Sequence, residues 1–526
     1  MTPLLNEGNM MQTQEDFNEL LATLRMQLKA DMEGKYRPVL KHLHAPEHTA
    51  ILDHLHRTNR HGETTCKFLV SLGVLRKMQL QDRLAGHADT PPHSVLGPIT
   101  THLRQDDTSY ALVSGCIQTL VTLAEHDANR VHLVEHGVVL PLLNLLQDEE
   151  LAKHAVYILS RVAGTGNAAD IIRLAHDGED VCELLDMLLS PDSEITWSVA
   201  EVLHKIADNK GAAQAMMRYE HGRDNIVHVM KPENDPCLQA HAAGIIAHVA
   251  RHKELQSAAG HQDVLDVLAG LIRHLNSHVR TAAAGALWAI SNMHKENAEA
   301  MLYLLPPTVN RISQAAGQEE ASGGTWGMEL ASFTGMLANI AAIRDGALEI
   351  AQRRGVCHLW PLLDWHSRDC HDVIISNALL TLSRIARVEA AFHAVAVIPE
   401  KSIARVAAFL NDEIVARRLH AGEVLAALAT DRTERAAKKI ARTGCMPTLL
   451  EVISTNDSPA LTLQSVHLLR NLSACQTVAK RLAELKGCVP TIEHLLRTGS
   501  DPQKRHASAL RGNILCSIGA DTFDKT

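Results

Sequence analysis

The stretch Ala286-Leu-Trp-Ala-Ile-Ser-Asn-Met293 closes an Ala- and Leu-rich helical run, and its second half returns along most of the chain. Each copy places a small or polar residue at the end of such a run, and we use this residue as a marker. The spacings between successive markers are 39, 44, 43, 44, 47, 45, 43, 44 and 42 residues. A near-constant period of this length is the signature of a stacked helical repeat. The markers are Thr122, Arg161, Lys205, His248, Asn292, Asn339, Arg384, Ala427, Asn471 and Asn513.

Glycines form a second pattern with the same period. Each follows a short helical run and precedes an apolar run, at Gly137, Gly178, Gly222, Gly260, Gly355, Gly444 and Gly487. Two skipped positions hold Leu305-Pro-Pro307 and Ile398-Pro399 instead. Gly adopts the left-handed conformation that often follows a helix, and Pro cannot continue one. Both patterns therefore predict that a first, short helix ends at these positions.

These residues resemble the armadillo-repeat family, whose unit is a short helix, a Gly, an apolar second helix that often carries Pro, and a longer third helix. The resemblance covers residues 95–519 and is clearest in Gly444-Cys-Met-Pro-Thr-Leu-Leu, Gly487-Cys-Val-Pro-Thr-Ile, Leu469-Arg-Asn-Leu-Ser473 and Trp288-Ala-Ile-Ser-Asn292. It implies an all-α fold: a right-handed α-solenoid of about ten armadillo-type repeats with an atypical helical N-terminal cap. Hydrophobic residues make up 46% of the chain but aromatic residues only 3%, so Ala, Leu, Val and Ile must fill the interior.

The 526 residues divide into several expected segments. Residues 1–10 are expected to be a disordered N-terminus, and 11–85 a helical N-terminal cap whose apolar spacing does not fit the later period. Residues 86–94 contain two prolines and are predicted to be a linker, followed by the armadillo-repeat solenoid over 95–519. The acidic, Gly-rich segment 317–327 is expected to leave the stack as a loop, and 520–526 to form a tail.

Composition limits the classes of partner. The formal charge of −9 is mild for this length, so no nucleic-acid partner is expected. No stretch of about 18 uncharged apolar residues is present, so no membrane span is expected. The ten cysteines lie singly, and Cys116 and Cys516 fall in apolar helical runs, which predicts reduced core residues of an intracellular protein. We expect a cytoplasmic protein, with a cytoskeletal, ciliary or nuclear location as alternatives.

The resemblance implies that the third-helix ends line a concave surface that binds extended peptide segments. An Asn side chain offers both a donor and an acceptor to a peptide backbone, so we expect Asn292, Asn339, Asn471 and Asn513 to hold one. Other markers are basic or titratable, and a surface carrying them would favour acidic segments. The alternative is that these cations are solvated or salt-bridged helix ends, stabilised by the helix dipole. The residues concerned are Arg161, Lys205, His248 and Arg384.

Trp288 precedes the marker Asn292 by four residues. Importin-α-like nuclear import adaptors show such a Trp and Asn pair in most repeats, where the pairs grip Lys-rich signals. Here the pair occurs once, so we do not expect import cargo to bind. Trp288 is therefore either a contact for another ligand or a residue of interhelical packing.

The sequence contains no recognisable catalytic motif: no Gly-x-Ser-x-Gly elbow, no Walker loop and no dinucleotide fingerprint after a strand. Its 32 histidines include pairs four residues apart, such as His248 and His252, but no third ligand at metal-site spacing accompanies them. We expect neither enzymatic activity nor a bound metal or cofactor.

The sequence favours a non-catalytic protein-protein interaction scaffold that binds extended, acidic segments in a concave groove. One alternative is a structural component of a ciliary, axonemal or other cytoskeletal assembly, in which case the outer face and loops would carry the contacts. Another is a chaperone cofactor or a regulator of a partner enzyme. The expected partners are therefore other proteins, as peptide segments or within a large assembly.

Overall fold

The computed structural model describes residues 93–104, 110–125, 127–148, 150–174, 179–316, 325–364, 370–397, 399–430, 434–456 and 458–519. The predicted disordered segment 1–10, helical cap 11–85 and tail 520–526 lie outside these residues. So do most of the predicted linker and most of the predicted loop 317–327. The last two linker residues and the last three loop residues are helical, because α4 begins at His93 and α20 begins at Thr325.

Every described element is helical, so the protein is all-α within the described ranges. The chain divides into two compact units, with the boundary between Val249 and Ala250. The helices of the first unit are α4 (His93–Leu103), α5 (Tyr110–Ala124), α6 (Asp127–Glu135), α7 (Val139–Leu143), α8 (Ala152–Val162), α9 (Ala168–Leu174), α10 (Glu179–Met187), α11 (Ser193–Ile206), α12 (Lys210–Arg218), α13 (Gly222–Met230) and α14 (Pro236–Arg251), which ends just past the boundary.

The second unit continues the same succession of helices. They are η3 (Lys253–Leu255), α15 (Gln256–Ala259), α16 (Gln262–Leu271), α17 (Ser277–Ser291), α18 (Lys295–Ala300), η4 (Leu302–Leu304), α19 (Leu305–Ala316), α20 (Thr325–Ala341), α21 (Arg344–Gln352), α22 (Gly355–Leu362), α23 (His371–Ala386), α24 (Phe392–Ala396), α25 (Glu400–Ala408), η5 (Phe409–Asn411), α26 (Val415–Leu428), α27 (Arg435–Arg442), α28 (Cys445–Thr455), α29 (Pro459–Ser473), α30 (Gln476–Ala483), α31 (Cys488–Thr498) and α32 (Asp501–Ile518).

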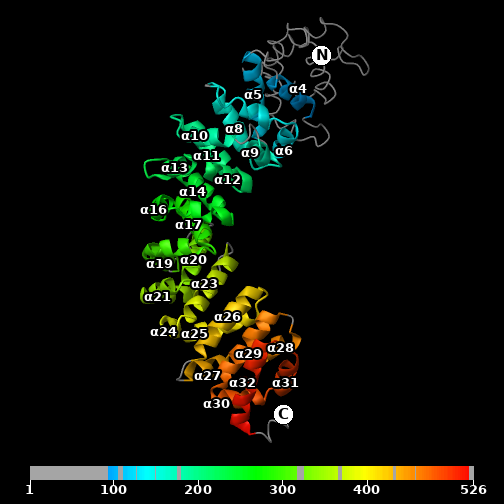
Figure 1. Cartoon of the computed structure of the whole chain (residues 1–526), viewed down its shortest axis with the longest axis vertical. Coiled ribbons are helices and arrows are strands. Elements are labelled where there is room, and N and C mark those ends of the chain that lie inside the picture. Colours follow the sequence, from blue (N-terminus) through cyan, green and yellow to red (C-terminus); the bar gives the residue numbers. More distant parts are fainter. Residues whose placement is uncertain are drawn as a thin grey trace, which may run out of the picture. The chain divides into compact units, whose positions relative to one another are not determined.

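Two or three shorter helical segments precede each long helix, and this order recurs along both units. We call the long members α8, α11, α14, α17, α20, α23, α26, α29 and α32 the third helices. In the first unit α8 packs against α11. In the second unit the third helices pack in succession: α17 against α20, α20 against α23, α23 against α26, α26 against α29, and α29 against α32 (Figure 1). Sequential packing of this kind is consistent with a helical solenoid.

The predicted breaks between first and second helices have more than one physical cause. Gly444 and Gly487 have φ angles of +82° and +84°, the left-handed conformation that Gly tolerates best. Gly222 does not have a positive φ. A Cβ atom there would lie 2.1 Å from the carbonyl oxygen of Met216, so a close approach of the backbone requires Gly.

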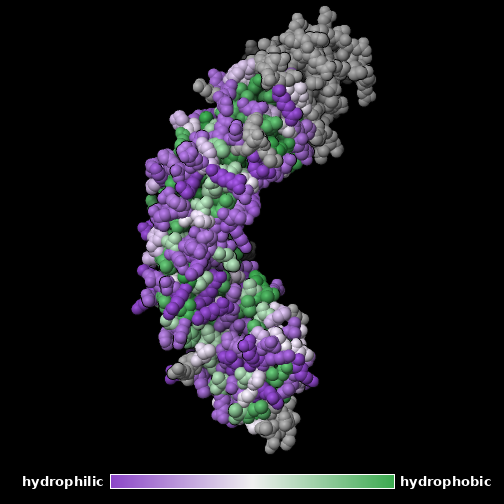
Figure 2. All heavy atoms as spheres, in the orientation of Figure 1, coloured by the Kyte–Doolittle hydropathy of each residue, from purple (hydrophilic) through white to green (hydrophobic). Residues whose placement is uncertain are grey.

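The core consists of aliphatic side chains and Ala from all three helices of a repeat. Hydrophilic residues cover much of the visible surface of each unit, while hydrophobic residues appear in smaller areas between them (Figure 2). Cys116 is buried as predicted, and burial raises the pKa of its thiol to about 12. Cys516 is exposed, so the prediction of a core position was wrong. The buried stripe of α32 runs through Leu510 and Ile514, and Cys516 lies off that stripe.

A buried ion-pair group links α17, α19 and α20. Glu329 is only 2% exposed and accepts hydrogen bonds from Arg280 at 2.9 and 3.0 Å and from Arg311 at 2.6 and 3.1 Å. Arg280 also donates to the carbonyl oxygens of His274 and Leu275, in the connection that precedes α17. One carboxylate therefore connects three helices.

We expect the substitution Glu329→Gln to destabilise the second unit by about 3 kcal/mol, because it leaves two partly buried guanidinium groups without a counter-charge. Urea unfolding followed by circular dichroism would measure the change. The control is Glu413→Gln, at an exposed carboxylate, which should change stability by less than about 0.5 kcal/mol. Equal effects of the two substitutions would contradict a structural role for the buried group.

Candidate functional site

The marker residues lie at equivalent places in both units, in or directly after the last turn of the third helices. In the first unit Arg161, Lys205 and His248 lie on α8, α11 and α14. In the second unit Asn292 caps the end of α17, and the remaining predicted site residues lie on α20, α23, α29 and α32: Asn339, Arg384, Asn471 and Asn513. Within each unit, the predicted residues therefore line one edge of the stacked third helices.

Five of the ten marker side chains donate a hydrogen bond to the preceding third helix. Lys205 donates to the Ser160 carbonyl, Asn339 to that of Trp288, Arg384 to that of Ala338, Asn471 to that of Ala426 and Asn513 to that of Arg470. Asn339 and Asn513 also donate to hydroxyl groups on the same helices, at 3.2 Å to Ser291 and 2.9 Å to Ser473. We call Lys205, Asn339, Arg384, Asn471 and Asn513 the capping ladder.

The accepting carbonyl groups explain why the ladder exists. The last four carbonyl groups of an α-helix have no partner within that helix. Every backbone acceptor of the capping ladder lies among the last four residues of its helix, as Ala426 does in α26 (Val415–Leu428). Because a polar group left unpaired away from water costs about 1–3 kcal/mol, a donor at this position stabilises the repeats that have one. The sequence period thus reflects a structural requirement of neighbouring repeats.

The side chains of the capping ladder are hydrogen-bond donors to the preceding helix, and some of their acceptor atoms remain available to a ligand. The side-chain oxygens of Asn339 and Asn513 accept no hydrogen bond from the described residues, although the nitrogen of each amide is engaged. Asn292 is exposed, and its side chain forms no hydrogen bond within the described ranges. Asn471 differs, since it is 6% exposed and its oxygen accepts from Arg470 at 3.1 Å. Asn292, Asn339 and Asn513 therefore keep the capacity to bind a ligand.

Trp288 packs between neighbouring third helices. A Cβ atom added to Gly335 on α20 would lie 2.3 Å from the Trp288 indole, so the ring rests directly on the backbone of α20. The side chain is half-buried. Of the two interpretations of Trp288, interhelical packing is the one that the contacts support.

The cations of the first unit have a carboxylate partner that the sequence analysis did not identify. Glu201 accepts from Lys205 at 2.7 Å and lies 3.8 Å from Arg161, whose guanidinium also lies over the Tyr157 ring. The salt-bridged alternative therefore describes Arg161 and Lys205. The spacing of four residues between Glu201 and Lys205, with Glu first, could have indicated this pair.

The remaining basic and titratable markers differ from each other. His248 lies 3.1 Å from a carboxylate oxygen of Asp208. Arg384 forms no salt bridge with the described residues, and burial lowers the pKa of its guanidinium. The charge of Arg384 is thus less compensated than that of Arg161 or Lys205.

Aromatic rings connect α11 and α14. The His204 ring lies between those of His241 and His248, with centroid distances of 5.4 and 5.1 Å, and Trp197 contacts His241 edge-on. The Nδ1 atoms of His204 and His241 are 3.2 Å apart, so one donates to the other. Burial and the neighbouring imidazoles lower the pKa of His204 to about 4.

Glu423 on α26 has a position similar to that of Glu201 on α11, because each lies four residues before the marker of its helix. Its carboxylate accepts from Ser383 at 2.7 Å, contacts His420 at 3.3 Å and forms a salt bridge with Arg387. Burial opposes ionisation of Glu423, but the hydrogen bonds from His420 and Ser383 and the charge of Arg387 lower its pKa to about 2. This group takes the place of a ladder bond at α26, where the marker is Ala427 and offers no donor.

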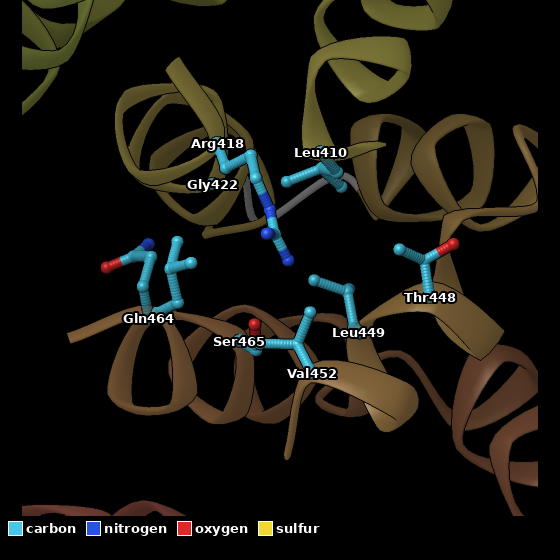
Figure 3. Close-up of a pocket in the computed structure, with 9 residues that line it drawn as sticks. Leu410, Arg418, Gly422, Thr448, Leu449, Val452, Gln464 and Ser465 are labelled. Atoms are coloured by element: carbon cyan, nitrogen blue, oxygen red, sulfur yellow. The ribbon is translucent and has the colours of Figure 1, made fainter. Parts of the chain in front are cut away.

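A cavity and a surface depression lie outside the marker row. The cavity has a volume of about 10 Å³, which suits roughly one water molecule, and the Arg418 guanidinium points into it (Figure 3). It is lined by Leu410, Arg418, Gly422, Thr448, Leu449, Val452, Leu461, Gln464 and Ser465. The depression, of about 500 Å³, is lined by three carboxylates, so it does not suit an acidic segment: Glu179, Glu183 and Asp186.

The described part of the chain also bears on metal binding and membrane insertion. Within it, no three His, Cys, Asp or Glu side chains are grouped in a way that could hold a metal ion. No helix in the same ranges is both long and apolar enough to cross a membrane.

Comparison with known proteins identifies the fold but not a family. No protein-family model matches the sequence, and no curated protein matches it. Among solved structures, the chain is similar to an engineered protein determined by the Northeast Structural Genomics Consortium, with a TM-score of 0.67 and 22% sequence identity. The match covers 80% of this chain and 98% of the engineered one. The similarity supports a helical repeat-like structure.

We expect Asn471→Ala to destabilise the second unit by about 1–2 kcal/mol, because it leaves the Ala426 carbonyl without its donor. Asn292→Ala is the matched control, since it removes the same side chain from an exposed marker position and should change stability by less than about 0.5 kcal/mol. Urea unfolding would compare both variants with the wild type. A smaller effect at Asn471 than at Asn292 would contradict the capping ladder.

The pKa of His204 predicts how the stability of the first unit depends on pH. Because the pKa is lowered from 6.5 to about 4 in the folded state, the unfolded chain binds a proton more readily. The stabilisation is present above about pH 6.5 and is lost as the pH falls towards 4. His204→Gln should reduce that loss by about 2 kcal/mol, measured by urea unfolding across this range. The exposed control His228→Gln should leave the pH dependence unchanged.

Proposed function

We propose that this chain is a non-catalytic scaffold of armadillo-type repeats that binds an extended protein segment along the third-helix ends. The row of partly exposed Asn side chains with unused oxygens is the observation that supports this function most directly. An extended backbone carries N–H groups that its own residues do not pair, and these can donate to such oxygens. The residues proposed for this contact are Asn292, Asn339 and Asn513.

The proposed preference for acidic segments is assigned to particular positions. Arg161 and Lys205 share Glu201, and His248 has Asp208, so an acidic ligand would have to compete with carboxylates already present. Arg384 forms no salt bridge with the described residues and supports an acidic preference better. We therefore place the contact with acidic side chains in the second unit, and treat the marker cations of the first unit as parts of its structure.

Selection from a displayed library of random extended peptides, followed by fluorescence anisotropy of the selected sequences, would test this function. The double variant Asn292→Ala/Asn339→Ala should weaken binding at least about fivefold, because a lost hydrogen bond contributes about 1 kcal/mol. The control Arg353→Ala/Lys480→Ala removes two exposed side chains, one directly after the first helix α21 and one on the first helix α30, and should leave affinity unchanged.

Thermal melts would establish that both double variants remain folded at the assay temperature. A selection that yields no binding peptide would contradict the proposal. So would peptides whose affinity is unchanged by the Asn substitutions but lost with the first-helix control.

A further inference from the structure

Four side chains at the end of the second unit form a group that we call the imidazole cluster: His467, Arg470 and Asn471 on α29, and His506 on α32. The two imidazole rings are stacked with their centroids 4.8 Å apart and their planes inclined by 35°. Arg470 Nη1 lies 3.0 Å from Nδ1 of His506. The histidines and Arg470 are half-buried, so they remain in reach of a ligand.

The hydrogen bonds determine the protonation of both rings. A guanidinium can only donate, so Nδ1 of His506 accepts from Arg470 and carries no proton. The Asn471 amide is oriented by Arg470, which donates to its oxygen, and by the Ala426 carbonyl, which accepts from its nitrogen. That nitrogen also lies 3.4 Å from Nε2 of His467, which therefore accepts. Both imidazoles are thus neutral in this arrangement.

Charges around the cluster favour the neutral rings. Burial lowers the pKa of His467 to about 4, with His506 and Arg470 adding to the effect, while Glu423 on α26 opposes it. Burial, Arg470 and Arg505 also lower the pKa of His506. No other charged group of the described residues shifts the pKa of either ring. Arg470 forms no salt bridge within the described ranges, so its guanidinium is not committed to a carboxylate there.

We propose that the imidazole cluster binds a carboxylate of an acidic partner segment and takes up one proton from solvent as it does so. The carboxylate would accept from Arg470 Nη1, which gives up its bond to His506. Nδ1 of His506 would then bind the incoming proton and donate to the same carboxylate, so that a neutral acceptor becomes a charged donor. This inference rests on the proposed function, and it names the ligand chemistry and the residues at this end of the surface.

The coupling to a proton predicts a particular pH dependence. One proton taken up per ligand makes binding tighter as the pH falls, by at most about tenfold per pH unit. A purely permanent charge would not produce this change, because glutamate side chains remain ionised well above their ordinary pKa of about 4.3. The pH dependence therefore separates the cluster from general attraction by Arg and Lys.

Fluorescence anisotropy with a labelled hexaglutamate peptide, at about pH 6.0 and about pH 7.5, would test the proposal on the full chain. We expect binding to be about fivefold tighter at the lower pH, because the ligand raises the affinity of His506 for a proton. His506→Gln should abolish this difference, and Arg470→Gln should weaken binding at both pH values. Lys486→Gln is the charge-matched control at an exposed position and should retain the wild-type pH dependence.

Thermal melts would confirm that the variants remain folded, and His467→Gln provides a second variant that leaves the Arg470 and His506 pair in place. Binding without pH dependence, or a pH dependence that persists in His506→Gln, would overturn the proposal. Absence of hexaglutamate binding would also overturn it, while leaving the library test of the proposed function unaffected.

Discussion

The unpaired carbonyl groups at the ends of the third helices are the constraint on which the stack depends. Helix geometry leaves the last four without a partner, and packing of the next repeat removes them from water. In the repeats of the capping ladder, a donor from the next repeat reaches back by one period to one of these carbonyl groups. Lys, Arg and Asn all supply such an N–H group, which explains why Lys205, Arg384 and Asn471 occupy the same structural position although their charges differ. At Ala427 no donor is present, and Glu423 links the helices instead.

This arrangement also determines what the surface can offer to a partner. Where an amide nitrogen is directed towards the previous helix, the oxygen of the same amide is left for a ligand, as in Asn339 and Asn513. Carboxylates on α11 and α26 form salt bridges with nearby cations. Positive charge without a salt bridge is therefore limited to particular positions near the third-helix ends. The structural role and the proposed binding role therefore belong to different atoms of the same side chains.

Much of the fold could be predicted from the sequence, because the signals involved are local and periodic. Marker spacing predicted the succession of long helices, and Gly444 and Gly487 predicted where short helices end. Contacts across helices were not predictable, since they depend on how separate segments pack. The Glu423 and Arg387 pair is 36 residues apart, and the stacking of Trp288 on Gly335 has no signal in a single repeat. The wrong prediction for Cys516 has the same origin: an apolar helical run does not reveal which stripe is covered.

The chain shares a helical repeat-like structure with an engineered protein at 22% sequence identity. Residues that serve the stack, such as the buried Asn471, are constrained by their neighbours and cannot vary freely to suit a partner. In the proposed function, specificity for a partner would therefore arise at positions that the packing of the helices does not constrain. The Asn292 side chain has no hydrogen-bond partner among the described residues, and His506 accepts a bond that Arg470 could equally give to a ligand. Such positions can change their hydrogen-bonding partner without exposing a helix end. The proposed recognition of a partner therefore disturbs the packing least at these positions.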